Sequence, residues 1–159
     1  MNQADKPSAS VDASSFQLVV GIDISSQTCR FCALKPDKSQ VIKPTEFANA
    51  PTGFGMLQEK LEQLGVPPEQ VLIGLEATSR YGENLYHFLE SRGYQLCLLH
   101  PRQTHQFAQQ RGLRAKTDKL DATTIARVLL SGEARRGYVP SDLIATSAGI
   151  GAAAYTTRR

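Results

Sequence analysis

The chain has 159 residues, of which 41% are hydrophobic and 21% are charged. This length suits one compact domain with a tail, and the apolar content excludes a chain that is disordered throughout. No apolar run reaches the roughly 18 residues needed to cross a bilayer, and the N-terminus lacks the layout of a signal peptide. We therefore expect a cytoplasmic protein with no membrane partner.

The net charge of +3 is unevenly distributed along the chain. Residues 1–91 carry 7 basic and 11 acidic side chains, whereas residues 92–159 carry 11 basic and 4 acidic ones. Such an excess of Lys and Arg is typical of a solvated surface or of a surface that binds a polyanion. The candidates for nucleic-acid contact are Arg102, Arg111, Arg114, Lys116 and Lys119.

The first part of the chain is expected to form a small antiparallel meander. Residues 1–15 have no periodicity and are predicted to be a disordered leader. Residues 16–24 read FQLVVGIDI, a continuous apolar run typical of a central strand that is covered on both faces. Strand patterns follow at 28–34 and 40–47 after short polar breaks, so these three strands are predicted to pair antiparallel.

The period then changes to that of helices alternating with strands. Apolar residues recur every three or four positions from Phe54 to Leu64, which predicts a helix that ends at Gly65. A strand at 71–76, a helix around 85–92 and a strand at 94–99 follow. Successive strand–helix–strand units predict parallel pairing with right-handed crossovers. We therefore expect an α/β fold with a mixed five-stranded sheet, three antiparallel strands followed by two parallel ones, and helices on both faces.

The last third of the chain is predicted to contain two helices and a tail. The helices are expected at 103–110 and at about 118–130. Residues 140–159 have many small side chains and no sustained period, so we expect a poorly ordered tail there. The folded domain is accordingly predicted to span residues 16–139.

Three cysteines raise the question of a metal or redox site. Cys29 and Cys32 form a CxxC pair, but a zinc site needs four ligands, and only Cys97 and three scattered histidines could complete it. Because the pair lies in a predicted strand, alternation sends the two side chains to opposite faces. Buried, reduced thiols are therefore favoured over zinc binding or redox chemistry.

Four acidic residues form the candidate catalytic site. Asp23 and Glu76 come at the carboxyl ends of predicted strands, where α/β folds usually bind ligands, and Asp118 and Asp121 lie three apart at the start of a predicted helix. Each has a structural alternative, since aspartate also favours turns and helix N-termini. Four converging carboxylates repel one another unless cations bind, and two Mg²⁺ or Mn²⁺ ions would suit these hard oxygen ligands.

The chain resembles a known family in three stretches, which read VVGIDIS, GLEATSRYGENLYHFLESRGYQL and HPRQTHQFAQQRGLRAKTDKLDATTIARVL. With their spacing, they are similar to the DEDD transposases of bacterial insertion sequences, the IS one-ten family, over residues 17–139. The resemblance implies an RNase H-like fold of the RuvC type. It also implies that Asp23, Glu76, Asp118 and Asp121 are the catalytic, metal-binding positions. DNA, a structured guide RNA and further copies of the chain are the implied partners.

The sequence also departs from that family. The family carries a second, C-terminal domain with a serine thought to act as the nucleophile, and nothing after Pro140 resembles it. The stretch SAGIGAAAYTTRR reads like a shifted frame or a fusion to unrelated sequence. Ser79 and His100 stand where the family commonly has glycine and asparagine, which we regard as tolerable changes. We therefore expect a transposase that is incomplete without its C-terminal domain.

Three other functions remain open at the level of sequence. The stretch VVGIDISSQT also resembles the first phosphate loop of actin-like sugar kinases, in which Ser25, Ser26 and Thr28 would contact nucleotide phosphates. A junction nuclease of the RuvC type would use the same four carboxylates. A non-catalytic fragment that only binds nucleic acid would keep the fold and the basic residues. The leading hypothesis is a transposase or recombinase domain that cleaves and transfers DNA strands with the help of divalent metal.

Overall fold

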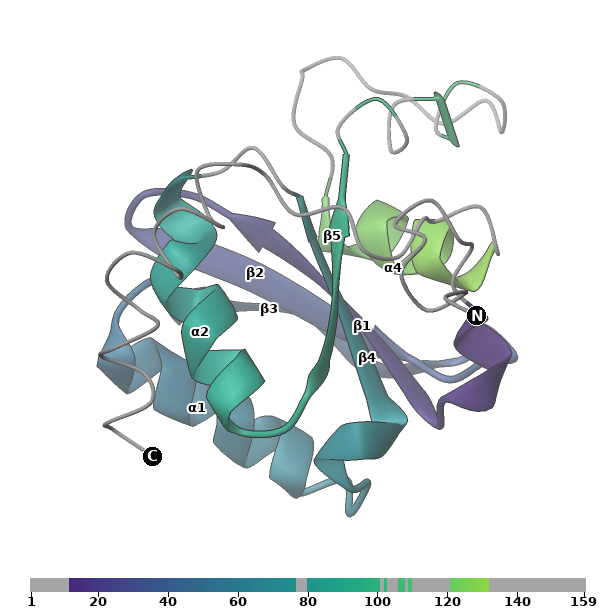
Figure 1. Ribbon diagram of the computed structural model, residues 1–159, viewed down its shortest axis with the longest axis horizontal. Helices are drawn as coiled ribbons and strands as arrows, with labels where there is room; N and C mark the ends of the chain where they lie inside the picture. The colour runs from purple at the N-terminus through teal and green to yellow at the C-terminus, as the bar shows by residue number, and fades with distance from the viewer. Residues whose placement is uncertain are drawn as a thin grey trace, which may run out of the picture.

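The computed structural model describes residues 12–76, 80–100, 102, 106–107, 109 and 121–131. Figure 1 shows the arrangement of its helices and strands. In chain order the elements are η2 (Ala13–Ser15), β1 (Leu18–Ile24), β2 (Thr28–Leu34), β3 (Gln40–Ala48), α1 (Pro51–Glu62), η3 (Pro68–Gln70), β4 (Val71–Glu76), η4 (Arg80–Gly82), α2 (Glu83–Ser91), β5 (Gln95–Leu99) and α4 (Ala122–Leu130).

The strands form one mixed sheet in the order β3-β2-β1-β4-β5. β1 pairs antiparallel with β2, and β2 pairs antiparallel with β3. β4 pairs parallel with β1 on one side and with β5 on the other. This arrangement confirms the predicted sheet of three antiparallel strands followed by two parallel ones, and it is consistent with an RNase H-like fold.

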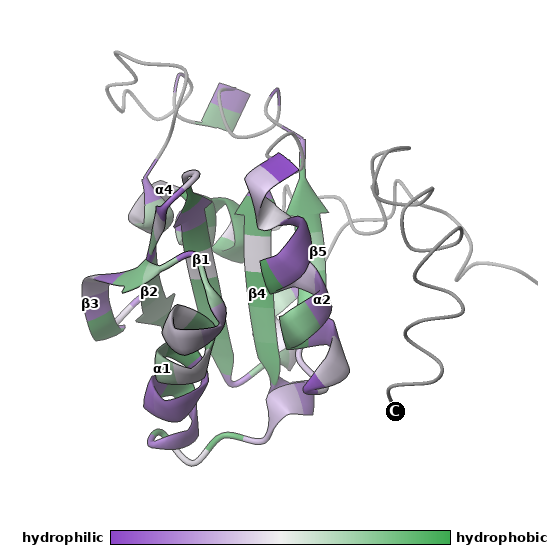
Figure 2. Cartoon of the chain, turned by 90° about the vertical axis from the view of Figure 1, so that its left-hand side faces the viewer, coloured by the Kyte–Doolittle hydropathy of each residue, from purple (hydrophilic) through white to green (hydrophobic). Residues whose placement is uncertain are grey.

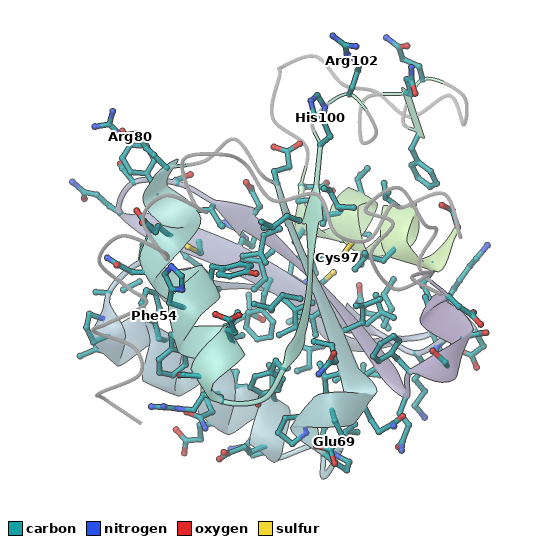
Figure 3. The ribbon with its side chains drawn as sticks, in the orientation of Figure 1. Phe54, Glu69, Arg80, Cys97, His100 and Arg102 are labelled. Carbon is teal, nitrogen blue, oxygen red and sulfur yellow. The ribbon has the colours of Figure 1, made fainter. Side chains whose placement is uncertain are left out.

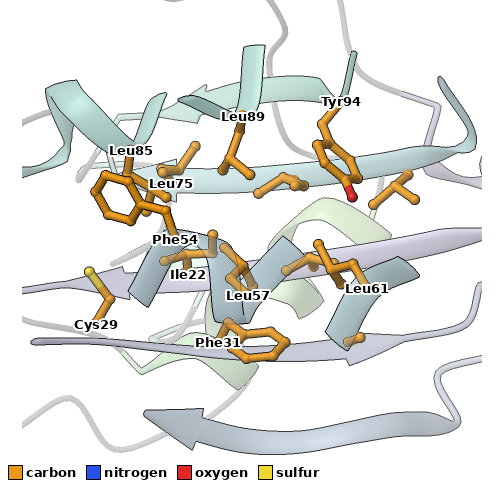
Figure 4. Close-up of a cluster of buried hydrophobic side chains, with 14 of the residues drawn as sticks. Ile22, Cys29, Phe31, Phe54, Leu57, Leu61, Leu75, Leu85, Leu89 and Tyr94 are labelled. Atoms are coloured by element: carbon orange, nitrogen blue, oxygen red, sulfur yellow. The ribbon is translucent and has the colours of Figure 1, made fainter. Parts of the chain in front are cut away.

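Helices cover both faces of the sheet, as Figure 2 shows, with α1 and α2 on one face and α4 on the other. The face under α1 and α2 holds the larger cluster of buried side chains. There Leu57 and Leu61 of α1 and Leu85 and Leu89 of α2 pack over the sheet, and each of the four is at most 1% exposed (Figure 4). Burial of this apolar stripe, more than helix propensity, is what stabilises two helices of this length.

The opposite face is covered by α4, and we call it the α4 face. Its buried cluster joins Val19 of β1, Cys32 of β2 and Leu72 of β4 to Ile125 and Leu129 of α4. Because the strands alternate, β1 sends Val19 to this face and Val20 to the other, and both side chains are fully buried. The continuous apolar run of β1 therefore reflects a central strand with a core on each side.

A shallow groove lined by two glycines seats α4 on this face. Gly21 of β1 lies beside Gly74 of β4 in the parallel register. A Cβ atom added at Gly21 would lie 2.2 Å from the carbonyl oxygen of Ala122, and one at Gly74 would lie 2.8 Å from a Leu129 methyl carbon. The absence of side chains at these two positions lets the helix backbone approach the sheet closely.

The boundaries of the helices follow their local sequence. α1 begins at Pro51, which suits a first helical position because its missing N–H has no helical partner there. Past the ends of α1 and α2, Gly65 and Gly93 adopt φ values of 74° and 92°, a region that favours glycine. The helix predicted around 118–130 is observed as Ala122–Leu130, with Asp121 as its N-cap.

The three cysteines are buried and form no disulfide. Cys29 packs into the cluster under α1 and α2, whereas Cys32 packs into the cluster under α4. The prediction that strand alternation separates this pair is confirmed. Within the described residues, no three His, Cys, Asp or Glu side chains gather closely enough to hold a metal ion.

Some expectations concern residues outside the described part of the chain. These include the tail at 140–159, the leader up to residue 11 and most of the helix expected at 103–110. Within the predicted leader, Ala13–Ser15 forms a short 3-10 helix capped by Asp12, and Ala13 is buried in the α4 cluster. Among the helices that the structure describes, none combines the length and the apolar character that a bilayer span requires.

A candidate metal centre at the carboxyl ends of the parallel strands

Two of the predicted acidic residues lie on adjacent parallel strands at the same edge of the sheet. Asp23 is the penultimate residue of β1, and Glu76 is the last residue of β4. The β1–β4 register pairs Ile22 with Leu75, so continuing it by one residue brings Asp23 beside Glu76. Neighbouring strands are about 4.8 Å apart, which is close enough for two carboxylates to share a cation.

Both carboxylates project from the α4 face. Asp23 follows Val19 by four residues and Glu76 follows Leu72 by four, and both of these apolar side chains belong to the α4 cluster. Because side chains alternate along a strand, positions four apart share a face. Asp23 and Glu76 are both half-buried, so they remain open to solvent at the edge of the core.

Asp121 approaches the same edge from the helix side. Its carboxylate caps α4, where Oδ1 accepts a hydrogen bond of 2.9 Å from the backbone N–H of Thr124. The next residue, Ala122, packs its backbone on Gly21, two positions before Asp23 in β1. A capping carboxylate uses one oxygen for the helix and can offer the other to a cation. The glycine groove thus brings the start of α4 to the strand end that carries Asp23.

These three residues carry carboxylate oxygens, the hard type of ligand that Mg²⁺ and Mn²⁺ prefer. The chemistry of the donor set therefore fits the expected metal, although Asp23, Glu76 and Asp121 do not by themselves close into a three-ligand group in the described residues. The fourth predicted ligand, Asp118, lies outside the described residues. A complete site would need its carboxylate or water ligands in addition.

The predicted nucleic-acid contacts are described in part. Arg102 is exposed, and its backbone N–H donates a hydrogen bond of 3.0 Å to Nδ1 of His100, the residue that follows β5. Figure 3 shows both side chains beyond the end of β5, the end of the sheet at which β4 carries Glu76. The remaining predicted contacts lie outside the described residues: Arg111, Arg114, Lys116 and Lys119.

Asn49, which the sequence did not single out, joins two loops at the edge of the sheet where Asp23 and Glu76 lie. The side-chain amide of Asn49 donates to the backbone oxygen of Ser25 at 2.8 Å and to that of Tyr81 at 2.9 Å. Ser25 follows β1, and Tyr81 lies in η4 after β4, so one amide group ties together the loops that follow Asp23 and Glu76. No periodicity or motif marks Asn49, because its partners are backbone groups far away in the chain.

A second missed residue is Arg30, which lies directly opposite Asp23 in the β1–β2 register. The tight turn between the strands fixes this pairing, with the backbone N–H of Ser25 donating to the oxygen of Thr28 at 2.9 Å. The residues considered as a kinase phosphate loop therefore belong to a hairpin turn. The seven-residue spacing between Asp23 and Arg30, across a short hairpin, was the signal that could have revealed their pairing.

Comparison with known proteins identifies a family model and two relatives. A family model described as a transposase, of the DEDD type found in IS one-ten elements, matches residues 20–146. Two pilin gene-inverting proteins, from Moraxella bovis and Moraxella lacunata, are each 31% identical over 108 residues. That alignment covers 68% of this chain and 33% of each relative. The chain therefore spans about a third of the length of these curated relatives.

Proposed function

Because this chain belongs to the DEDD transposase family of IS one-ten elements, we propose that it forms the metal-binding catalytic domain of a DNA transposase or recombinase. The proposal rests on one observation above all. The parallel register sets Asp23 beside Glu76, on the face and at the edge where Asp121 begins α4. All three positions, and Asp118 with them, lie inside the matched residues 20–146.

In this proposal the four carboxylates hold one or two divalent ions, Mg²⁺ or Mn²⁺. When bound, such ions polarise a phosphodiester and stabilise the oxygen that leaves. The side chains of Asp23 and Glu76 provide the fixed part of the site, since each is held in a strand with a core on both sides. Asp121 moves with α4, so the seat of that helix on Gly21 positions the third carboxylate. Rigid strands and a seated helix suit a reaction that depends on alignment.

We further propose DNA as the substrate, acted on in the cytoplasm, with a structured guide RNA and further copies of the chain as partners. The two relatives are named for inverting a pilin gene, and inverting a gene requires that DNA strands be cut and rejoined. Arg102 stands at the proposed catalytic edge, where it would meet a phosphate backbone. Family membership favours this function over that of a sugar kinase.

The experiment that tests the proposal is a cleavage assay with branched DNA and Mn²⁺. Wild-type chain is expected to nick the DNA, and Asp23→Asn is expected to reduce the rate at least about a hundredfold, since it removes a metal ligand. Asp37→Asn is the matched control. Asp37 is an exposed aspartate in the β2–β3 turn, at the other end of the sheet, and asparagine can keep its hydrogen bond from the N–H of Ser39.

The outcomes separate a catalytic domain from a fragment that only binds nucleic acid. Nicking that depends on both Mn²⁺ and Asp23 supports the catalytic domain. DNA binding without any nicking would instead support the non-catalytic fragment. Equal loss of nicking in the Asp23 and Asp37 variants would contradict a specific role for Asp23.

A further inference from the structure

Four charged residues form a row across four adjacent strands at the proposed metal site. Glu46 of β3 pairs with Arg30 of β2, and Arg30 pairs in turn with Asp23 of β1. The β1–β4 register, continued by one residue, adds Glu76 of β4. Arg30 precedes Cys32 of the α4 cluster by two residues, so this row lies on the α4 face. The order of charges is therefore negative, positive, negative, negative.

In this row the guanidinium of Arg30 has a carboxylate on each side. Its Nη2 is 3.3 Å from Oε1 of Glu46, an ion pair whose two side chains are 49% and 57% exposed. On the other side it adjoins Asp23, because residues directly opposite in an antiparallel pair have Cβ atoms about 5 Å apart. Asp23, Arg30 and Glu46 also line one small polar hollow of about 180 Å³, together with Ser25, Thr28 and Cys29. Arg30 and Asp23 therefore border the same space.

The position of this one guanidinium matters for any cation that Asp23 and Glu76 share. When the Arg30 guanidinium lies near Asp23, it repels a divalent ion bound there by Asp23 and Glu76. When the guanidinium is held at Glu46, it lies farther from that ion and repels it less. For charges about 8 Å apart at a solvated edge, one unit charge alters divalent affinity by about fivefold to thirtyfold. An arginine held by a single exposed ion pair is also easily released when its partner is removed.

We propose that Arg30 sets the affinity of Asp23 and Glu76 for divalent metal, and that Glu46 is a positioning residue that holds Arg30 away from Asp23. The inference rests on the proposed function, since it presumes that these carboxylates bind metal. Glu46 acts only through Arg30. Removing Glu46 should therefore weaken metal binding when Arg30 is present and leave it nearly unchanged when Arg30 is absent.

A double-mutant cycle on the full 159-residue chain tests this, with Mn²⁺ affinity measured at constant ionic strength. Glu46→Gln is expected to weaken Mn²⁺ binding about tenfold, because the released guanidinium moves toward Asp23. Arg30→Met is expected to tighten it about fivefold. In the Arg30→Met background, Glu46→Gln should change the affinity less than about threefold. Arg30→Lys keeps the charge and should lie between wild type and Arg30→Met.

Two controls make the result specific. Glu69→Gln removes an exposed carboxylate from η3, at the far end of the sheet (Figure 3), and should leave Mn²⁺ affinity unchanged. Asp23→Asn should abolish the binding that the cycle measures. Thermal melting of each variant checks the fold, which the changes at the exposed residues Arg30, Glu46 and Glu69 should hardly affect.

The outcomes distinguish this inference from the proposed function. If Mn²⁺ binds in a manner that depends on Asp23, yet Glu46→Gln has the same effect in both backgrounds, the positioning role is overturned and the metal site stands. Equal affinities in wild type, Glu46→Gln and Arg30→Met would overturn it as well. If no binding depends on Asp23, the metal site and the inference fall together.

Discussion

Replacing Gly21 with alanine tests whether the glycine groove decides where α4 lies. A Cβ atom at this position would lie 2.2 Å from the carbonyl oxygen of Ala122 and 2.6 Å from the backbone nitrogen of Ala126. Ordinary van der Waals contact begins at 3.4 Å, so the helix would have to move outward by about 1 Å. Both contacts are backbone atoms, which cannot rotate away as a side chain can.

The expected loss of stability is at the upper end of what overpacking costs, about 3 kcal/mol in the free energy of unfolding. Gly74→Ala is the matched comparison, because the three atoms nearest to its Cβ all belong to the side chain of Leu129, the first at 2.8 Å. Leu129 can change rotamer, so we expect a loss of about 1 kcal/mol there. Gly55→Ala is the control. Apart from its chain neighbours and its own helix backbone, no atom of the described residues lies within 4 Å of its Cβ, and alanine should stabilise α1 by about 0.5–1 kcal/mol.

Urea denaturation followed by circular dichroism measures these differences. The midpoints should fall in the order Gly55→Ala, wild type, Gly74→Ala, Gly21→Ala. Because Asp121 moves with α4, Gly21→Ala should also weaken Mn²⁺ binding, whereas Gly55→Ala should not. Equal midpoints for the Gly21 and Gly74 variants would refute the reasoning. They would mean that a clash with backbone atoms lowers stability no more than a clash with a side chain.

Two further predictions concern the capping residue and the response to alkaline pH. Asp121→Ala should lower the free energy of unfolding by about 1 kcal/mol, because it removes the cap of α4. Asp121→Asn should keep the cap and most of that stability but lose Mn²⁺ binding. Equal destabilisation by both variants would contradict a capping role. Burial raises the pKa of the Cys32 thiol and of the phenols of Tyr86 and Tyr94, with Glu90 and Glu62 adding to the rise for the two tyrosines. The unfolded chain therefore releases these protons at lower pH than the folded chain does. As a result, the melting temperature should fall as the pH rises above about 9. The variant Tyr86→Phe should make this fall less steep.

The sequence by itself determined the strands of the sheet, the helices between them and the change from antiparallel to parallel pairing. Residues 18–22 are apolar at successive positions, which is typical of a central strand with two covered faces, and β1 is that strand. The three- and four-residue spacing of Phe54, Leu57 and Leu61 likewise located α1, and all three side chains are buried. These predictions succeed because the buried face of a helix or strand carries apolar residues, and their spacing can be seen in the local sequence.

The carboxylates were also selected from the sequence, by their places at element ends and by the family resemblance. How they relate to their surroundings was decided by the tertiary structure. Arg30 is separated from Glu46 by 16 residues and Asn49 from Tyr81 by 32, and their contacts join groups in different elements. No pattern within one strand or helix records such a partner.

The seat of α4 shows most clearly what only the tertiary structure decided. Gly21 and Gly74 are 53 positions apart, and each is unremarkable within its own apolar strand. Only the parallel register of β1 and β4 sets them side by side and opens the groove that α4 enters. The groove lets the helix backbone pack on Gly21, two residues before Asp23, whereas Val19 on the same face of β1 carries a buried side chain. Local sequence selects the elements, whereas close packing between distant residues fixes where their ends meet.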